Sequence, residues 1–349
     1  MSKSQVIFHK TLPPSSLLGE ELLVIFDKTL LKVSPEFSRW IRGIEHVYSV
    51  QAGEKLKSVE DFAGHIKALT KISEKLSARK LTIVVVGGGS VGDFGGFVAS
   101  IFKRGVRLVH IPSTWLAAID SAHGGKTGLN VGGMKNQIGT FYPSAQTWII
   151  KSLLITQPES RAFEAYSELI KIALIIGGSF WKKISGERNV DSDLIWKYLP
   201  QAIRGKQSVV AKDPQEKTGL RHVLNLGHTV GHILETQYEL PHGVAINYGL
   251  TFALEWSAER GVMTSRESES LFAKPVMGFT LSASRDGLFK NNASLMKQFK
   301  KLLLGDKKKT TGSKMRFVFL AKPGKFVIQE VSADEILKEI SRQQKAENI

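Results

Sequence analysis

The sequence predicts an α/β domain built on a parallel sheet over residues 1–155, followed by a mostly α-helical domain over residues 156–349. Two observations carry this prediction. In the first part of the chain, short apolar runs alternate with amphipathic helical patterns, as in doubly wound parallel sheets. After about Ile155, long patterns with helical periodicity dominate.

The strongest strand signal is Leu81–Val86, LTIVVV, which is apolar and β-branched almost throughout, as expected of a central parallel strand covered on both faces. Similar runs predict the other strands, at Leu22–Phe26, Val47–Val50, Val106–Ile111 and Thr147–Ile150. Between them, helices are expected at Pro35–Arg42, Val59–Leu76 and Val91–Phe102.

In the second part of the chain, apolar positions recur at helical spacing. Five helices are expected, at Glu159–Ile176, Leu194–Lys212, Arg221–Thr236, Ala245–Arg260 and Ala293–Leu304. One late hairpin is expected from Met315–Leu320 and Phe326–Val331, with its turn at Lys322-Pro323-Gly324.

Composition limits the classes of partner. The chain carries a formal net charge of +16 and no cysteine, so disulfide and thiolate chemistry are excluded. The basic residues are scattered and come with no nucleic-acid-binding signature, so the charge favours small anionic ligands over nucleic acid. Without a membrane-spanning run or a signal-peptide core, we expect a cytoplasmic protein with no membrane partner.

A glycine-rich turn, Gly87-Gly88-Gly89-Ser90, follows the strongest strand and precedes a helix. Such a turn lets the backbone approach a pyrophosphate, which the helix N-terminus attracts. The turn is not the GxGxxG fingerprint, so phosphate binding and plain tight-turn geometry stay equally supported. Asp93, in the first helical turn, fits either dipole compensation or a hydrogen bond to a cofactor.

The next polar segment, Ile111–Asn136, reads as a loop with little potential to form a core. It contains Asp120, a Gly124-Gly125-Lys126-Thr127 turn, Lys135 and Asn136, a composition typical of anion-binding loops. Arg104-Gly105, just before the preceding strand, reads on sequence alone as a solvated turn.

Histidines cluster in Arg221–His242, which holds four of the nine in the chain. His228 and His232 are four residues apart, so a helix places both on one face, as a divalent metal or a proton relay needs. Glu168 and Lys171, three apart on another helix, are either an exposed ion pair or a carboxylate ligand beside a lysine.

Seven motifs occur in one order along nearly the whole chain: GGGSVGDFGGF, IDSAHGGKTGLN, MKNQIGTFY, SELIK, RHVLNLGHTVGHILE, LPHG and GDKK. In this the chain resembles the 3-dehydroquinate synthase family of sugar-phosphate cyclases. The resemblance implies an N-terminal NAD-binding α/β domain, a C-terminal metal-binding helical domain, and NAD with zinc or cobalt as cofactors. It also implies conversion of 3-deoxy-D-arabino-heptulosonate 7-phosphate to 3-dehydroquinate and phosphate. That reaction runs through transient oxidation by NAD, phosphate elimination, re-reduction and intramolecular aldol closure.

The resemblance also assigns residues. It makes Glu168, His228 and His242 the metal ligands, and moves His232 to the substrate. The residues around the substrate would be Asp120, Lys126, Lys135, Asn136, Lys171, Lys206, Arg221, Asn225, His232 and Lys307. Arg104 would reach the phosphate pocket of a neighbouring subunit, which makes a homodimer the expected assembly. NAD would contact Glu54, Lys57, Gly89, Ser90, Val91, Gly92, Asp93, Ser113, Thr114, Lys126, Lys135, Leu153, Leu154, Ile155 and Thr156.

The sequence departs from the family pattern in places. Val244 stands where the family usually has an acid after the metal histidine, and His123 replaces an aliphatic residue. Arg221 and Asn225 are both kept, which favours the dehydroquinate reaction over other sugar phosphates. A glycerol-dehydrogenase-like alcohol dehydrogenase is the alternative, but a neutral polyol does not need this cationic site. A nucleic-acid-binding role would rest on charge alone.

Overall fold

The computed structural model describes residues 4–282, 293–305 and 314–347 of the chain. The chain forms two compact units, residues Met1–Ala162 (unit 1) and Phe163–Ile349 (unit 2). The division into domains after residue 155 stays a prediction. Among the described residues, no helix is both long and apolar enough to cross a membrane.

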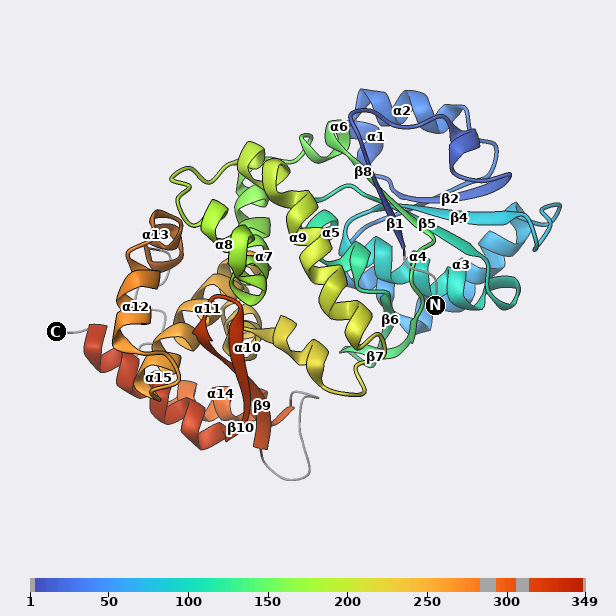
Figure 1. The fold of residues 1–349 in the computed structure, drawn as a ribbon. Coiled ribbons are helices and arrows are strands. Elements are labelled where there is room, and N and C mark those ends of the chain that lie inside the picture. The colour runs from blue at the N-terminus through green and yellow to red at the C-terminus, as the bar shows by residue number, and fades with distance from the viewer. Residues whose placement is uncertain (1–3, 283–292, 306–313, 348–349) are drawn as a thin grey trace. The chain divides into compact units, whose positions relative to one another are not determined.

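Unit 1 contains the predicted parallel sheet, with six strands in the order β1-β8-β5-β4-β2-β3 (Figure 1). Every neighbouring pair in it is parallel. The strands are β1 (Gln5–His9), β2 (Glu21–Asp27), β3 (Val47–Val50), β4 (Leu81–Gly87), β5 (Arg107–Pro112) and β8 (Gln146–Ile150). The five predicted strands are confirmed, while β1 was not predicted.

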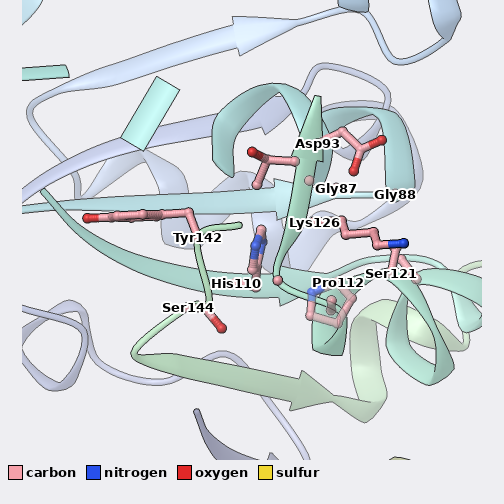
Figure 2. Close-up of a pocket in the computed structure, with 14 residues that line it drawn as sticks. Gly87, Gly88, Asp93, His110, Pro112, Ser121, Lys126, Tyr142 and Ser144 are labelled. Carbon is pink, nitrogen blue, oxygen red and sulfur yellow. The ribbon is translucent and has the colours of Figure 1, made fainter. Parts of the chain in front are cut away.

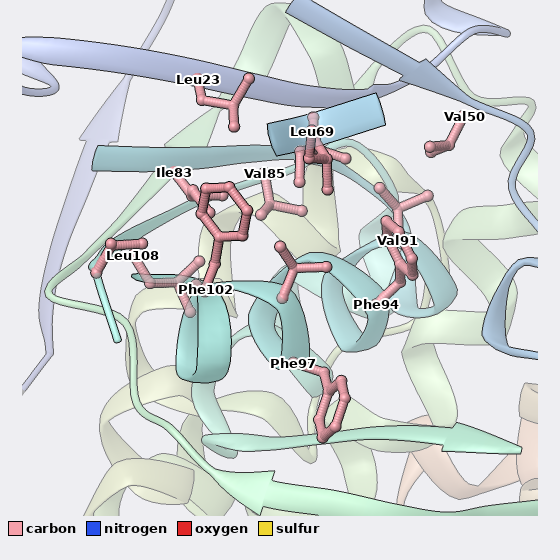
Figure 3. Packing of buried hydrophobic residues seen from close by; sticks show 14 of the residues in the cluster. Leu23, Val50, Leu69, Ile83, Val85, Val91, Phe94, Phe97, Phe102 and Leu108 are labelled. Carbon is pink, nitrogen blue, oxygen red and sulfur yellow. The ribbon is translucent and has the colours of Figure 1, made fainter. Parts of the chain in front are cut away.

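Helices cover both faces of this sheet, which explains why β4 is buried along its whole length. Its residues alternate between two cores. Ile83 and Val85 pack with Phe94 and Leu69 of the helices on one face (Figure 3). Val84 and Val86 pack on the other face with Phe37. The helices are α1 (Leu30–Val33), α2 (Pro35–Arg42), α3 (Val59–Ile72) and α4 (Gly89–Ile101).

The segment predicted as a loop over Ile111–Asn136 is mostly ordered secondary structure. It contains α5 (Trp115–Ile119), the 3₁₀ turn η4 (Ser121–His123) and β6 (Lys126–Val131), which pairs antiparallel with β7 (Met134–Phe141). The expectation that it lacks core potential is wrong, because Leu129 is fully buried in the core shared with α3 and α4. Short 3₁₀ or helical turns complete the unit: η1 (Ser15–Leu17), η2 (Glu54–Lys57), η3 (Phe102–Arg104) and α6 (Lys151–Leu154).

Unit 2 is mostly helical, as predicted. Its first helix is α7 (Glu159–Ile176), whose first four residues are counted in unit 1. The others are α8 (Gly178–Ile184), α9 (Ser192–Lys212), α10 (His228–Tyr238), α11 (His242–Glu259), α12 (Ser265–Phe272), α13 (Pro275–Ser282), α14 (Ala293–Gly305) and α15 (Ala333–Glu347). The predicted hairpin is present as β9 (Lys314–Lys322) and β10 (Lys325–Ser332), with Gly324 at φ +86° in its turn.

One helix prediction in unit 2 is wrong. Arg221–Thr236 is not continuous, because the 3₁₀ turn η5 (Leu220–Asn225) ends before α10 begins. Leu226 has a non-helical ψ of 123° and Gly227 has φ +78°, so the chain changes direction between the two elements. This break makes His228 the first residue of α10.

Candidate metal and cofactor sites

Three elements of unit 2 bring a carboxylate and two imidazoles together. Glu168 lies on α7, His228 begins α10 and His242 begins α11. Glu168 Oε1 lies 3.3 Å from His228 Nε2 and 3.8 Å from His242 Nε2. The ring of His232, one turn further along α10, lies beside both, with ring centroids 5.2 Å from His228 and 6.1 Å from His242.

Glu168 is fully buried, and its charge is compensated by cationic neighbours. Lys171, also buried, forms an ion pair with its other oxygen, Oε2. Burial alone would raise the pKa of Glu168, but the Lys171 ammonium and the two histidines hold that pKa well below its usual range. The exposed surface ion pair considered for Glu168 and Lys171 is therefore wrong, because both side chains lie inside the unit.

The two histidines respond differently to this environment. Burial and the nearby Lys171 ammonium lower the pKa of His228 to about 4. Burial also opposes the charged form of His242, but the Glu168 carboxylate, 3.8 Å from Nε2, and the Glu235 carboxylate, which accepts a hydrogen bond from Nδ1, raise its pKa to about 10. The centre is thus a buried anionic group between two imidazoles, an arrangement that favours a cation.

Glycines allow these helices to approach closely enough for the ligands to meet. A Cβ atom at Gly243, in the first turn of α11, would lie 2.2 Å from the backbone oxygen of Glu164 on α7. The neighbouring Ser167 hydroxyl donates to the Gly243 carbonyl oxygen over 2.5 Å. A Cβ atom at Gly249 would lie 1.9 Å from the Gly227 oxygen, at the start of α10. The crossings therefore exclude any side chain at these positions.

The donor set fits a divalent transition metal. The three ligand atoms all lie within 4.8 Å of one another. Ligands of a tetrahedral zinc ion with bonds of about 2.1 Å are roughly 3.4 Å apart, close to the spacing from Glu168 to each imidazole. One oxygen and two nitrogen ligands leave coordination positions for a substrate, as in catalytic sites.

Other predicted residues of unit 2 have contacts of their own. Arg221 is buried and donates to the Pro214 oxygen over 3.1 Å. Asn225 Nδ2 lies 3.1 Å from His222 Nδ1, and His222 Nε2 lies 3.0 Å from the Arg316 carbonyl oxygen, which makes the fourth histidine of the cluster structural. Lys206 is buried on α9. Lys307 lies outside the described residues.

In unit 1, the glycine turn lies where β4 ends and α4 begins. A Cβ atom at Gly87 would lie 2.6 Å from Val91 Cβ, so the turn is tight for packing reasons as well. The Ser90 hydroxyl accepts a hydrogen bond from the Gly53 backbone N–H over 3.0 Å. The Thr114 hydroxyl caps α5 by accepting from the Ala117 N–H over 3.1 Å. Both hydroxyls thus have structural partners in unit 1.

A buried lysine connects several of the predicted cofactor residues. Lys57 is 3 % exposed and donates to Asp93 Oδ2 over 2.7 Å and to Asn136 Oδ1 over 2.6 Å. Burial raises the pKa of Asp93, and the Lys57 ammonium opposes that change. Asn130 extends the network by donating to Glu54 Oε2 over 2.8 Å. The network joins η2, α4, β6 and β7.

A pocket lies beside this network, at the carboxyl ends of β4 and β5 (Figure 2). Its lining includes the predicted residues Gly92, Asp93 and Lys126. Its other lining residues are Gly87, Gly88, His110, Pro112, Ala117, Ser121, Ala122, Gly125, Thr127, Tyr142 and Ser144. His110, whose pKa burial lowers to about 4, was not predicted. Its place near the carboxyl end of a parallel strand was the available signal.

The remaining predicted cofactor residues of unit 1 lie outside this pocket lining. Leu153 and Leu154 are fully buried. Ile155 is 57 % exposed, and Thr156 donates from its hydroxyl to the Leu153 oxygen over 2.6 Å. Lys135 is exposed on β7, and Ser113 is buried. Asp120, which was predicted to contact the substrate and not the cofactor, is the residue between α5 and η4.

Arg104 lies at a sharp corner between α4 and β5. Lys103, Arg104 and Gly105 have φ values of +47°, +69° and +102°, three left-handed residues in succession. Lys103 holds the corner by donating to the Ser73 oxygen over 3.2 Å. Non-glycine residues rarely take this conformation, and the corner leaves Arg104 exposed on the surface. The solvated turn expected here is confirmed.

Comparison with known proteins covers both units. Residues 47–164 match the family model described as 3-dehydroquinate synthase N-terminal, and residues 165–309 match the one described as 3-dehydroquinate synthase C-terminal. The 3-dehydroquinate synthase of Leptospira interrogans is 36% identical over 312 residues, covering 86% of this chain and 81% of that protein.

Solved structures share the fold. A 2-deoxy-scyllo-inosose synthase complexed with carbaglucose-6-phosphate, NAD⁺ and Co²⁺ aligns with a TM-score of 0.81 at 22% identity, covering 97% of this chain and 96% of that chain. The 2-epi-5-epi-valiolone synthase of Streptomyces hygroscopicus, with NAD⁺ and Zn²⁺ bound, aligns with a TM-score of 0.81 at 20% identity, covering 99% and 98%.

Proposed function

The chain belongs to the 3-dehydroquinate synthase family, and we infer that it converts 3-deoxy-D-arabino-heptulosonate 7-phosphate to 3-dehydroquinate and phosphate. The enzyme depends on NAD and a divalent metal, zinc or cobalt. The reaction is a transient oxidation, phosphate elimination, re-reduction and intramolecular aldol closure. The observation that carries the assignment is that both family models match in order along the chain.

We propose Glu168, His228 and His242 as the metal ligands, because their ligand atoms converge in unit 2. The metal, when bound, lowers the pKa of the substrate hydroxyl that is oxidised and fixes its orientation. His232, whose ring lies beside both ligand imidazoles, is placed to move a proton next to that hydroxyl. Lys171 keeps the Glu168 carboxylate ionised and therefore able to bind a cation.

We propose that unit 1 holds NAD through the glycine turn and the Lys57 network. The N–H groups of the first turn of α4 offer hydrogen bonds to the pyrophosphate. Lys57 accounts for the orientation of Asn136, because its ammonium donates to Oδ1 and an amide oxygen is the acceptor of that side chain. Cytoplasmic location stays a prediction from sequence.

The cationic residues predicted around the substrate fit a ligand with two anionic groups, a carboxylate and a phosphate. We propose that Lys126, Lys206, Arg221 and Asn225 bind its carboxylate, phosphate and hydroxyl groups. Charge-assisted hydrogen bonds from such groups both select the ligand and stabilise negative charge that develops during elimination. The net charge of +16 also attracts a phosphorylated sugar acid to the protein.

The first test is phosphate release from 3-deoxy-D-arabino-heptulosonate 7-phosphate, with NAD and zinc or cobalt each supplied or withheld. We expect release only when both are present, with no net NADH, because the hydride returns to the product. A fully supplemented protein that releases no phosphate contradicts the assignment. Net NADH formed from glycerol would instead support the alcohol dehydrogenase alternative.

We also propose that Arg104 completes the phosphate pocket of a second copy in a homodimer, because the left-handed corner presents this side chain outward. The test is complementation between Arg104→Ala and Glu168→Gln chains that carry different affinity tags. Each variant is expected to be inactive as a homodimer. A mixed dimer has one site with both native residues, so about half of the unchanged activity is expected after tandem purification.

The activity of the mixed dimer shows whether Arg104 acts in the site of the other subunit or in the site of its own subunit. If Arg104 serves its own subunit, neither site of the mixed dimer is intact and the mixed dimer stays inactive. Full activity of the Arg104→Ala homodimer would mean that the side chain is not required at all. Either result contradicts the proposal, and size-exclusion chromatography of each species controls for the assembly state.

A further inference from the structure

Helix α10 presents a third polar residue on the face that carries His228 and His232. Glu235 is seven positions after His228 and three after His232, which places all three on one side of the helix. The family resemblance assigned no role to Glu235. Its carboxylate Oε2 lies 2.9 Å from His242 Nδ1, on the next helix.

The two ring nitrogens of His242 therefore face different carboxylates. Nδ1 faces Glu235, and Nε2 faces Glu168 Oε1 at 3.8 Å. An ionised carboxylate only accepts hydrogen bonds, so Glu235 keeps a proton on Nδ1. When a metal ion binds, Nε2 is therefore the nitrogen that loses its proton and supplies the lone pair, and Nε2 is the atom that faces Glu168.

His228 is held in the same way by a different group. Its Nδ1 lies 3.2 Å from the Leu226 carbonyl oxygen, while its Nε2 lies 3.3 Å from Glu168 Oε1. The Leu226 carbonyl comes from the break before α10, so backbone geometry orients this ring. His242 is the first residue of α11, directly after Pro241. Its Nδ1 is held by the Glu235 carboxylate instead of a backbone carbonyl.

A second group of possible metal ligands shares His242 with the proposed set. In this second group, the ligand atoms of His232, Glu235 and His242 also lie within 4.8 Å of one another. Burial decides between the two groups. Glu168 is fully buried, whereas the side chain of Glu235 is 26% exposed. A fully buried carboxylate needs a cation more than one that water partly solvates. Both imidazoles also direct Nε2 toward Glu168.

We propose that Glu235 is a positioning residue of the metal centre, whose carboxylate holds His242 so that Nε2 binds the metal. This rests on the proposed ligand set of Glu168, His228 and His242. A carboxylate that binds the far nitrogen of a ligand histidine typically changes metal affinity by about 10- to 100-fold. Glu235 acts through His242 and is not itself a ligand.

The test measures Co²⁺ binding to the metal-free protein by competition with a chelating dye, together with the visible absorption spectrum of the Co²⁺ form. Glu235→Leu is expected to raise the Kd for Co²⁺ by about 10- to 100-fold. Glu235→Gln keeps an oxygen that accepts from Nδ1 but loses the charge, so an intermediate Kd is expected. The changed His242 orientation is expected to alter the Co²⁺ spectrum.

Glu239→Gln is the matched control, because Glu239 is an exposed carboxylate at the C-terminal end of the same helix. It should leave the Kd and the spectrum unchanged, and urea unfolding should show that all three variants are folded. Neither the Kd for Co²⁺ nor the absorption spectrum depends on catalytic turnover. A Glu168→Gln variant that keeps native Co²⁺ affinity would overturn the ligand set, independently of Glu235.

Two results would overturn the Glu235 proposal alone. The first is a Glu235→Leu protein that binds Co²⁺ as tightly as the unchanged chain and with the same spectrum. The second is a stoichiometry that falls from two ions per chain to one in the Glu235 variants. The second result would make Glu235 a ligand of a separate ion together with His232 and His242.

Discussion

Replacing Glu168 with glutamine is expected to lower phosphate release by about a thousand-fold or more and to weaken zinc and cobalt binding. Glu168 is the charged member of the proposed ligand set, and the metal contributes several kcal/mol to transition-state stabilisation. A loss of about 4 kcal/mol corresponds to roughly a thousand-fold in rate. The measurement is kcat/KM for phosphate release, paired with the Co²⁺ Kd.

Stability has to be separated from catalysis in this variant. The substitution leaves the buried Lys171 ammonium without its counter-ion, which typically costs about 3–5 kcal/mol in unfolding free energy. The double variant Glu168→Gln/Lys171→Met removes both charges and is expected to recover much of that stability. Metal binding should stay weak in the double variant. If metal affinity returned along with stability, the loss in the single variant would be structural and Glu168 would not be a ligand.

Replacing Gly249 with alanine is expected to destabilise unit 2 by more than about 4 kcal/mol, among the largest effects of any single substitution. The added methyl carbon would lie 1.9 Å from the Gly227 oxygen and 2.8 Å from the Gly231 nitrogen, both backbone atoms of the α10 segment. Backbone cannot move aside as a flexible side chain can, so α10 and α11 must separate. The measurement is urea unfolding followed by circular dichroism.

Gly278→Ala is the control in the same unit. Gly278 is an exposed position of α13 where an added Cβ meets no atom within 4 Å. There the substitution should be neutral or stabilising by about 0.5–1 kcal/mol, since alanine favours helix. Metal affinity should fall with Gly249→Ala, because His228 directly follows Gly227. A Gly249→Ala protein as stable as the unchanged chain would contradict the observed helix crossing.

The sequence predicted best where one physical signal dominates. Apolar β-branched runs identified the central strands, because a strand buried on both faces has to be apolar throughout. The β6–β7 hairpin was missed because Leu129 is its only buried apolar side chain, and the surrounding glycines, lysines and asparagines give no strand pattern. The break at Leu226–Gly227 was missed because helical periodicity continues across it in the sequence.

The residues of the candidate site also differ in whether a local sequence signal could identify them. Spacing alone paired His228 with His232, because these two residues share a helix face. Glu168 and His242 were separate candidates from sequence, and only the family resemblance joined them with His228 in one ligand set, since local spacing does not give the distances between helices. The role of Glu235 could be recognised only from the three-dimensional structure, because its hydrogen bond to His242 depends on how α10 and α11 cross. No local sequence signal reports that crossing.

The place of β1 in the sheet has a consequence for how the protein is made. β1 pairs along all five of its residues with β8, the last strand of the sheet to be synthesised. On a ribosome, the first strand therefore waits on the order of 10 s for its partner, while β2, β4 and β5 can already assemble. β1 is the edge strand of the sheet, so removing residues 1–9 would move the edge to β8 and expose its apolar run Trp148–Ile150, which favours pairing between chains. β1, which is only partly buried itself, thus covers a strand that is buried at four of its five residues.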